Sequence, residues 1–370
     1  MKISSIQIFR YQLPFSKSII LAKKNFDFRE GLLIRILDSE GQIGIGEIAP
    51  LPGFSLESLA ESTSQSMKLA EMLVAQSIPR DLSVLQGAFQ RWFSLPNLVS
   101  SVKFGFQMAV LNLLAAQSQI PVAQLISSEK PKTLSLTRLL SGTPDEILSK
   151  ADKIAQSPFV SRVKLKVGRI GLDQEVDLVQ EVRTRIGSKF LQLDANRSWD
   201  LATAVYFGRQ VSDCELLYIE EPLKNPLECS EFTSQTGIGY ALDETLQHPE
   251  YRFKMREGLV ALVLKPTLSG GIETAKMIAE EALEHQVRAV ISSSYESSLG
   301  LIMLANLAAS RTFDVSVGLD TYDVFQYDLC HPEFLETEGR IPLQLLTGQP
   351  TIYEDRLELL WQKSKTKTSR

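Results

Sequence analysis

Five charged side chains recur at the ends of five short apolar runs in the middle of the chain. The runs end at Lys166, Asp194, Glu220, Asp243 and Lys265. Each run is rich in β-forming residues and is followed by polar sequence and then by a helical pattern, which is typical of βα units on a parallel sheet. Charged residues at the carboxyl ends of successive strands are typical of the catalytic face of a (β/α)₈ barrel. We therefore expect these five side chains to converge at one mouth.

Three of the converging side chains are carboxylates. Adjacent strands lie roughly 4.8 Å apart, so Asp194, Glu220 and Asp243 must share a cation or take up protons. Ligation by oxygen alone, without a nearby His or Cys, favours Mg²⁺ over zinc, and we expect that Mn²⁺ can replace it. The strand order places Lys166 and Lys265 on opposite sides of the metal. A metal-bound substrate carboxylate would then hold its α-carbon between two amines, with a lysine as the base and the metal stabilising the enediolate.

Other polar residues near these strand ends have less specific interpretations. A lone Asp or Lys at a strand end is more often a loop or helix-cap residue, but five in the order Lys-Asp-Glu-Asp-Lys are hard to explain as caps. Glu221 and Glu244 each stand beside a proposed ligand and are interpreted as supporting or capping groups. Lys164 faces the same interior as Lys166 because side chains alternate along a strand. It either pairs with the carboxylates or lowers the pKa of Lys166.

The spacing of the runs predicts a complete barrel. Further strand ends fall at Ser292 and Gly318, and the stretch that begins at Thr133 supplies a first strand, so eight strands can be counted. The number of residues between successive strand ends is enough for one strand, one helix and two loops. The predicted fold is α/β, with a modified TIM-like (β/α)-barrel as the catalytic domain at residues 101–334.

The two ends of the chain predict a second, smaller unit. Residues 31–37 and 43–47 read as strands on either side of a turn with hairpin chemistry. Residues 1–100 are therefore predicted to form an α+β capping domain, and residues 335–370, which contain no ninth unit, are predicted to return to it. The polar and basic segment 14–28 is expected to be a mobile loop. Helices are predicted over residues 56–75, 82–93 and 101–118, and from the pattern Thr143-Pro144-Asp145-Glu146.

Composition excludes several classes of function. The chain has 370 residues and a net charge of −5, which gives no basic surface for nucleic acid. The three cysteines show no C-x-x-C spacing, which favours reduced thiols and a cytoplasmic protein. The sequence shows no signal peptide and no apolar run long enough to span a bilayer. The expected partner is a small-molecule carboxylate substrate, and a monomer is compatible with the sequence.

Short motifs carry a family resemblance over nearly the whole chain. They are Lys164-Leu165-Lys166, Asp194-Ala195-Asn196, Glu220-Glu221-Pro222, Asp243-Glu244 and Lys265-Pro266. This set resembles the enolase superfamily in its muconate-lactonizing-like branch, whose base-and-Mg²⁺ chemistry is a known pattern. Residues 50–54, 193–199, 265–271, 291–300 and 318–321 are similar more specifically to the o-succinylbenzoate synthase family, and the serine-rich segment 291–300 is the most specific sign.

The resemblance implies a role for each charged residue. Lys166 would be the base, and then the acid that helps hydroxide leave, in the syn dehydration of 2-succinyl-6-hydroxy-2,4-cyclohexadiene-1-carboxylate to 2-succinylbenzoate. This lyase reaction belongs to menaquinone or phylloquinone biosynthesis. Asp194, Glu220 and Asp243 would bind Mg²⁺, and Lys265 would stabilise the enediolate from the opposite face of the ring.

The resemblance also implies a binding site for the rest of the substrate. The implied substrate-binding residues are Ser292, Ser293, Gly318, Asn196, Gly53 and Phe54. Ser292, Ser293 and Gly318 would meet the succinyl carboxylate through backbone N–H groups and hydroxyls. Loops near residues 16–25 and 50–54 would close over the substrate and exclude water.

Two alternatives stay open. An N-acylamino acid racemase or a dipeptide epimerase of the same superfamily also needs two lysines, so the charged site alone does not exclude it. Dipeptide epimerases share an Asp-x-Asp at strand 8, whereas this chain has Gly318-Leu319-Asp320-Thr321-Tyr322-Asp323. In a different class, a non-catalytic ligand-binding barrel would tolerate loss of any of the five charged groups, and all five are present.

Overall fold

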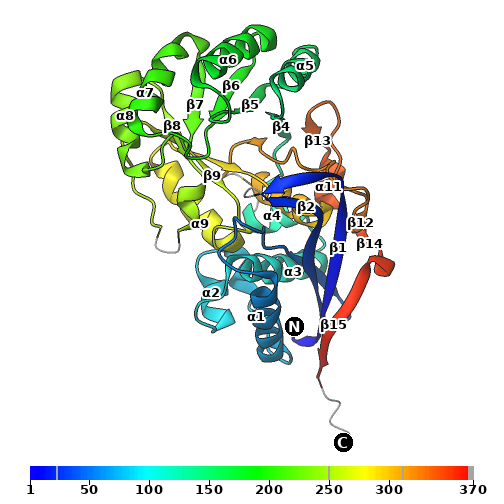
Figure 1. Ribbon diagram of the computed structural model, residues 1–370. Coiled ribbons are helices and arrows are strands. Elements are labelled where there is room, and N and C mark those ends of the chain that lie inside the picture. Colours follow the sequence, from blue (N-terminus) through cyan, green and yellow to red (C-terminus); the bar gives the residue numbers. More distant parts are fainter. Residues whose placement is uncertain (22–23, 128, 249–250, 311, 366–370) are drawn as a thin grey trace, which may run out of the picture.

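The structure is a computed structural model that describes residues 1–21, 24–127, 129–248, 251–310 and 312–365. It shows a barrel of strands surrounded by helices, and a smaller capping part beside the barrel (Figure 1). The capping part is built from the first strands of the chain, the first helices and the last strand, so segments from both ends of the sequence lie side by side.

Eight parallel strands form the barrel within the described ranges. They are β4 Leu134–Leu140, β5 Arg162–Lys166, β6 Phe190–Asp194, β7 Leu216–Glu220, β8 Tyr240–Leu242, β9 Leu259–Leu264, β10 Arg288–Ile291 and β11 Ser316–Val317. They follow the order β10-β9-β8-β7-β6-β5-β4-β11, and a parallel bridge between Ser292 and Gly318 brings the two ends of the sheet together. The predicted α/β fold with a modified (β/α)-barrel is confirmed.

Helices follow most of these strands. They are α5 Pro144–Ala155, α6 Leu172–Ile186, α7 Leu201–Gln210, α8 Cys229–Thr236, α9 Gly271–Glu284 and α10 Ser298–Ala308, with short 3₁₀ turns η2 Ser212–Cys214 and η3 Pro226–Glu228. α5 begins with the predicted capping box, because the side chains of Thr143 and Glu146 each accept from the other's backbone N–H. The helical pattern expected after Asp243 is wrong for the described residues, where only the 3₁₀ turn η4 Glu244–Gln247 forms. A proline follows His248 in the sequence and disfavours helical geometry there.

The capping part combines an antiparallel sheet with helices. Its strands are β1 Ile3–Leu21, β2 Lys24–Asp38, β3 Ile43–Ile48 and β15 Leu357–Ser364, in the order β15-β1-β2-β3. Its helices are α1 Leu59–Leu73, η1 Arg80–Val84 and α2 Ala88–Phe93, followed by α3 Ser100–Ser118 and α4 Val122–Ser127. α1 starts later than predicted because the side chain of Ser58, rather than an earlier serine, accepts from the backbone N–H of Glu61.

The segment 14–28 is a long hairpin rather than the predicted mobile loop. β1 and β2 pair in antiparallel register out to Leu21 and Lys24, with Pro14 opposite Phe28. Apolar residues alternate along both strands here, at Ile19 and Leu21 and again at Phe26 and Phe28, and this favours extended structure over the polar character on which the loop prediction rested. Residues 22 and 23, at the centre of the expected loop, lie outside the described residues.

The C-terminal segment contacts both parts of the molecule. β15 pairs antiparallel with β1, with Trp361 opposite Ile8. Earlier in the segment, β13 Arg340–Ile341 pairs antiparallel with the barrel strand β4. The remaining elements are β12 Cys330–His331, α11 Leu343–Thr347, β14 Thr351–Ile352 and η5 Glu354–Arg356. The division of the chain near residues 100 and 334 stays a prediction.

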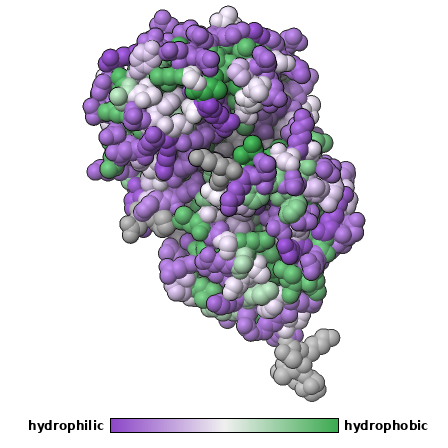
Figure 2. Space-filling model, in the orientation of Figure 1, coloured by the Kyte–Doolittle hydropathy of each residue, from purple (hydrophilic) through white to green (hydrophobic). Residues whose placement is uncertain are grey.

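The visible surface mixes hydrophilic and hydrophobic residues, with hydrophilic residues prominent along the outer rim of the barrel (Figure 2). No helix among the described residues is long and apolar enough to cross a bilayer.

Helix α3 lies unusually close to strand β3. A Cβ added at Gly46 would lie 1.9 Å from the carbonyl oxygen of Gly105, and one added at Gly105 would lie 2.3 Å from the side chain of Ile48. Glycine at both positions lets the helix and strand backbones approach, and this packing fixes the end of β3 against the barrel side of the molecule.

We predict that Gly105→Ala lowers the free energy of unfolding by about 1–3 kcal/mol, because the added methyl group overpacks this contact. Urea denaturation of the purified protein measures the change. Gly171→Ala is the matched control, since its added Cβ comes no closer than 3.5 Å to any neighbour. Equal stability of the two variants would contradict the close packing.

Candidate active site

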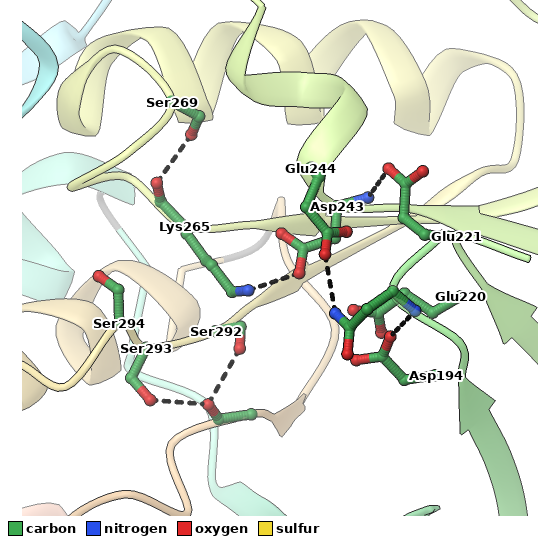
Figure 3. Close-up of polar contacts among 12 residues, drawn as sticks. Asp194, Glu220, Glu221, Asp243, Glu244, Lys265, Ser269, Ser292, Ser293 and Ser294 are labelled. Atoms are coloured by element: carbon green, nitrogen blue, oxygen red, sulfur yellow. Dashed lines mark hydrogen bonds and ion pairs between the residues drawn. The ribbon is translucent and has the colours of Figure 1, made fainter. Parts of the chain in front are cut away.

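The structure brings the five charged strand-end residues together at one mouth of the barrel. Lys166, Asp194 and Glu220 are the last residues of β5, β6 and β7. Asp243 and Lys265 directly follow β8 and β9. Asp194 and Glu220 are fully buried and Asp243 is 2% exposed. Figure 3 shows Lys265 directed toward Asp243, with Asp194 and Glu220 beside it.

One side of the cluster contains two lysines and two carboxylates. Lys166 Nζ donates to Asp194 Oδ2 at 2.6 Å. Lys164 Nζ lies 2.8 Å from both Asp194 Oδ2 and Glu220 Oε1. Lys164 therefore pairs with the carboxylates, which was one of the two roles that the sequence predicted for it. Both lysines point inward because they alternate with Val163 and Leu165, which are buried on the helix side of the strand.

Burial and neighbouring charge act against each other on these carboxyl groups. Burial would raise the pKa of Asp194, but Lys164 and Lys166 hold that pKa below its usual range. Burial raises the pKa of Glu220 well above its usual range, and the charges of Asp194 and Asp243 raise it further. Burial and like charge thus act in the same direction on Glu220, against the contact with Lys164.

The other side of the cluster is held by a second layer of polar contacts. Lys265 Nζ donates to Asp243 Oδ2 at 2.5 Å, and although burial lowers the pKa of Lys265, Asp243 raises it above its usual range. Glu221 Oε1 accepts the backbone N–H groups of Asp243 at 2.9 Å and Thr245 at 2.7 Å. Arg197 Nε donates to Glu221 Oε2 at 3.0 Å. Glu221 therefore orients Asp243.

Asn196, predicted to contact the substrate, hydrogen-bonds to Lys166. Its Oδ1 accepts from Lys166 Nζ at 2.7 Å, and its Nδ2 donates to Glu244 Oε1 at 2.7 Å. The chain Lys166–Asn196–Glu244 gives Asn196 a part in orienting Lys166, which the sequence prediction of a substrate contact did not include.

A serine-rich loop lies beside Lys265 (Figure 3). We call residues 292–297, between β10 and α10, the serine loop. The hydroxyls of Ser292 and Ser293 donate to the carbonyl of Gly318 at 3.2 and 3.1 Å. A Cβ at Gly318 would lie 2.8 Å from Ser292 Oγ, so glycine is needed for this approach. Ser293 Oγ also lies 2.8 Å from Thr321 Oγ1.

The backbone N–H groups of these residues are already used within the barrel. Ser292 N donates to Leu264, Ser293 N to Gly318, and Gly318 N to Ile291. The prediction that these N–H groups would meet the substrate carboxylate is therefore wrong, because they complete the parallel sheet where the barrel closes. The side-chain hydroxyls of Ser292 and Ser293 also contact the carbonyl of Gly318, but they are not part of the sheet ladder.

An apolar cover lies over this side of the mouth. Leu21 of β1, Leu51 and Leu268 are buried together, and Phe54 and Tyr295 pack against them. Gly53 precedes Phe54 in a tight turn with φ +81°, which favours glycine. The 50–54 loop therefore contacts barrel loops that follow β9 and β10. The predicted companion loop near residues 16–25 falls partly outside the described residues.

Two charged residues of the capping sheet also reach the serine loop, and the sequence prediction missed both. Arg29 Nε donates to the carbonyl of Tyr295 at 3.1 Å. Glu47 accepts from Ser297 N at 3.0 Å. Glu47 is a lone carboxylate inside an apolar run, with Ile45 before it and Ile48 after it, and that placement is the signal that could have identified it.

The residues present fit a divalent cation. Asp194, Glu220 and Asp243 offer only oxygen ligands, which suit Mg²⁺. Asp243 Oδ1 is buried without a hydrogen-bond partner, and the three carboxylates are buried at the ends of adjacent strands. Among the described residues no three such side chains stand as a ready metal cage, because lysine ammonium groups contact the carboxylate oxygens. A bound cation would take over part of these contacts.

A cavity of about 930 Å³ lies elsewhere, between α3, α10 and the segment 346–354. It is lined mainly by apolar side chains, and none of the candidate catalytic, metal-binding or substrate-binding residues borders it. Convergent charge and buried carboxylates therefore identify the barrel mouth, and not this cavity, as the candidate active site.

Comparisons with known proteins show what the chain as a whole is similar to. Residues 146–348 match the family model "Enolase C-terminal domain-like", and residues 3–113 match "MenC, N-terminal domain". The o-succinylbenzoate synthase of Pectobacterium atrosepticum is 32% identical over 96% of this chain and 99% of its own length. The N-succinyl Arg/Lys racemase of Bacillus cereus has the same fold, with a TM-score of 0.82 at 20% identity over 98% of this chain and 99% of that chain. A dipeptide epimerase of Enterococcus faecalis, complexed with Mg and a dipeptide, gives 0.78 at 18% identity over 98% of each chain.

We predict that Glu221→Gln lowers the free energy of unfolding by about 1–3 kcal/mol, because an amide cannot accept from all the donors that face the buried carboxylate. Chemical denaturation gives the value. Glu181→Gln is the control: Glu181 pairs with Arg185 on the surface, and such pairs contribute at most about 1 kcal/mol. A Glu221→Gln protein as stable as the Glu181→Gln protein would show that Glu221 does not hold Asp243.

Proposed function

The chain belongs to the o-succinylbenzoate synthase family of the enolase superfamily, and we propose that it dehydrates 2-succinyl-6-hydroxy-2,4-cyclohexadiene-1-carboxylate to 2-succinylbenzoate at the barrel mouth. The family is a family of lyases. The proposal rests on one observation above all: Lys166 and Lys265 stand on opposite sides of three buried carboxylates. The product is a precursor of menaquinone or phylloquinone.

Lys166 is the proton-transfer group in this proposal. As the free amine, Lys166 Nζ takes the proton from the carbon that bears the carboxylate. The resulting ammonium then gives a proton to the departing hydroxyl, so the C–O bond breaks, water leaves and the ring becomes aromatic. A single group can serve both steps because the proton and hydroxide leave from the same face. The contact with Asn196 Oδ1 orients Nζ for this task.

Lys265 has an electrostatic task. Its contact with Asp243 raises its pKa above the usual range, so it stays an ammonium. From the opposite face of the ring it stabilises the negative charge that develops on the substrate carboxylate as the proton leaves. The positively charged Lys164 lies beside Asp194 and Glu220.

Asp194, Glu220 and Asp243 would hold Mg²⁺, with Mn²⁺ as an alternative. The dipeptide epimerase described with bound Mg has the same fold, which supports this assignment. When bound, the ion would stabilise the extra negative charge on the substrate carboxylate. Ser292 and Ser293 would bind the succinyl carboxylate through their hydroxyls.

The dipeptide epimerase alternative is weaker at strand 8. Asp320 is the carboxylate there that could hold a substrate ammonium, but Arg138 Nη1 donates to its Oδ1 at 2.8 Å. Its Oδ2 accepts the backbone N–H of Leu139 at 2.9 Å. Asp320 joins the first and last strands of the barrel, so it is not available to an amine.

The lysines give the sharpest test of the proposed reaction. Lys166→Ala and Lys265→Ala should each lower kcat roughly 10²–10⁴-fold, measured by formation of the aromatic product. The exposed Lys68→Ala serves as the control. With an analogue that keeps the α-proton but lacks the hydroxyl, exchange in D₂O should require Lys166 and persist in Lys265→Ala. Exchange that survives in Lys166→Ala and stops in Lys265→Ala would reverse the assignment of faces.

Metal dependence is a separate test. EDTA should abolish turnover, and Mg²⁺ or Mn²⁺ should restore it. Asp243→Asn should weaken Mg²⁺ binding by more than about tenfold, because it removes one charge from the oxygen ligands, as calorimetric titration would show. Asp152→Asn, on the surface of α5, is the control and should bind Mg²⁺ normally. Full turnover in a rigorously metal-free sample would exclude the proposed cofactor.

A further inference from the structure

Glu47 is a buried carboxylate of the capping sheet that reaches into the barrel. It lies near the end of β3 and is fully buried. Its Oε1 accepts from the backbone N–H of Ser297 at 3.0 Å and from the phenol of Tyr11. Its Oε2 accepts from the backbone N–H of Gly300 and from Ser297 Oγ, both at 2.9 Å. The carboxylate therefore receives four hydrogen bonds, three of them from the serine loop and the first turn of α10.

Two glycines make room for this contact. A Cβ at Gly300 would lie 2.5 Å from Glu47 Oε2, and a Cβ at Gly31 would lie 2.3 Å from the hydroxyl of Tyr11. Any other residue at either position would move the carboxylate or the phenol. The close approach of α3 to β3 at Gly105 fixes the backbone of Glu47 from the other side.

Arg29 adds a second link from the same sheet to the same loop. It is 2% exposed, and besides Tyr295 O it donates to the carbonyls of Pro50 at 2.7 Å and of Ala49. One guanidinium thus joins the serine loop to the start of the 50–54 loop. The capping sheet contacts the serine loop through a cation at Tyr295 and an anion at Ser297.

From these contacts we propose that Glu47 is a positioning residue that sets the serine loop, and with it the hydroxyls of Ser292 and Ser293, for the second carboxylate of the substrate. The inference rests on the proposed function, since it assigns those hydroxyls to the succinyl group. Recognition of that group then depends on how the capping sheet docks on the barrel. The reacting centre at Lys166 and Lys265 does not depend on Glu47.

The contact requires a carboxylate. Each oxygen of Glu47 faces a backbone N–H, from Ser297 on one side and Gly300 on the other. A glutamine in either orientation would place its NH₂ group against one of these N–H groups, and neither can turn to accept. Glu47→Gln should therefore shift the serine loop while keeping the size of the side chain.

Glu273 provides a matched control. It is 4% exposed, and its two oxygens accept the backbone N–H groups of Phe89 and Gln90 at 3.1 Å each, which joins α9 to α2. Glu273→Gln creates the same conflict at a contact between barrel and capping helices, away from the serine loop. Comparing the two variants therefore separates a general loss of stability, which both would share, from an effect on the serine loop, which only Glu47→Gln would show.

The experiment measures kinetics and three binding affinities. Glu47→Gln should raise the KM of the cyclohexadiene substrate and the Kd of 2-succinylbenzoate about tenfold, with kcat changed by less than about threefold. The Kd of benzoate, which lacks the succinyl arm, and of Mg²⁺ should not change. Glu273→Gln should leave all five values unchanged. Tyr11→Phe, which removes one of the four donors, should raise KM by about two- to threefold and serves if Glu47→Gln does not fold.

The pH dependence gives a second readout. Burial raises the pKa of Glu47 to about 7, against the lowering effect of its hydrogen bonds from Tyr11 and Ser297. Because protonated Glu47 resembles glutamine, the ratio of KM between Glu47→Gln and the wild type should fall toward one below pH 7 and be largest above it. The charged and titratable groups around Glu47 are Tyr11, Arg29, Glu296, Asp328 and Cys330. Ionisations of these groups that occur in both proteins cancel in the ratio of the two KM values.

The outcomes separate this inference from the proposed function. A wild-type chain that binds 2-succinylbenzoate no better than benzoate, and forms no aromatic product, overturns the proposed function and the inference with it. A wild type that does both, with unchanged KM and Kd in Glu47→Gln or Tyr11→Phe, overturns only the positioning role. Equal shifts of KM in Glu47→Gln and Glu273→Gln would also overturn it.

Discussion

Burial of like charges at the barrel mouth is the constraint on which the rest of the structure depends. Asp194, Glu220 and Asp243 stand at the ends of adjacent strands and are almost completely buried. Carboxylates in such surroundings repel one another and lose hydration, so the fold must supply positive charge from nearby. Lys166 and Lys265 supply it from the strands on either side of the three carboxylates, and this arrangement also leaves a substrate between two lysine side chains.

The capping part completes what the barrel cannot provide alone. A barrel mouth is open to water, and water weakens every charge interaction within it. Leu21 and Leu51 from the capping part meet Leu268 of the barrel in a small apolar cluster beside the charged residues. The same sheet places Arg29 and Glu47 against the serine loop. Shielding of the site and positioning of its loop therefore come from one docking surface.

The charged centre could be predicted from sequence because its residues obey a simple local rule. Side chains alternate along a strand, and parallel strands end on one side, so Asp194 and Glu220 had to meet. Contacts between distant segments follow no such rule. The backbone N–H of Ser293 was predicted to be free for a ligand, yet barrel closure at Gly318 uses it. Glu47 is 250 residues from Ser297, and only packing of the sheet on the barrel reveals the contact.

The distinction between residues placed by the local strand rule and contacts between distant segments also explains how one barrel can serve different reactions. Fold neighbours of this chain include a racemase and a dipeptide epimerase at 18–20% identity. A metal-binding carboxylate set flanked by lysines specifies chemistry next to a carboxylate, and it says little about the rest of the substrate. In this chain Asp320, which follows the last barrel strand, forms an ion pair with Arg138 of the first barrel strand. Glu47 contacts the serine loop from outside the barrel. On the proposed role of Glu47, recognition of the rest of the substrate falls where strand ends meet the capping sheet, apart from the charged centre.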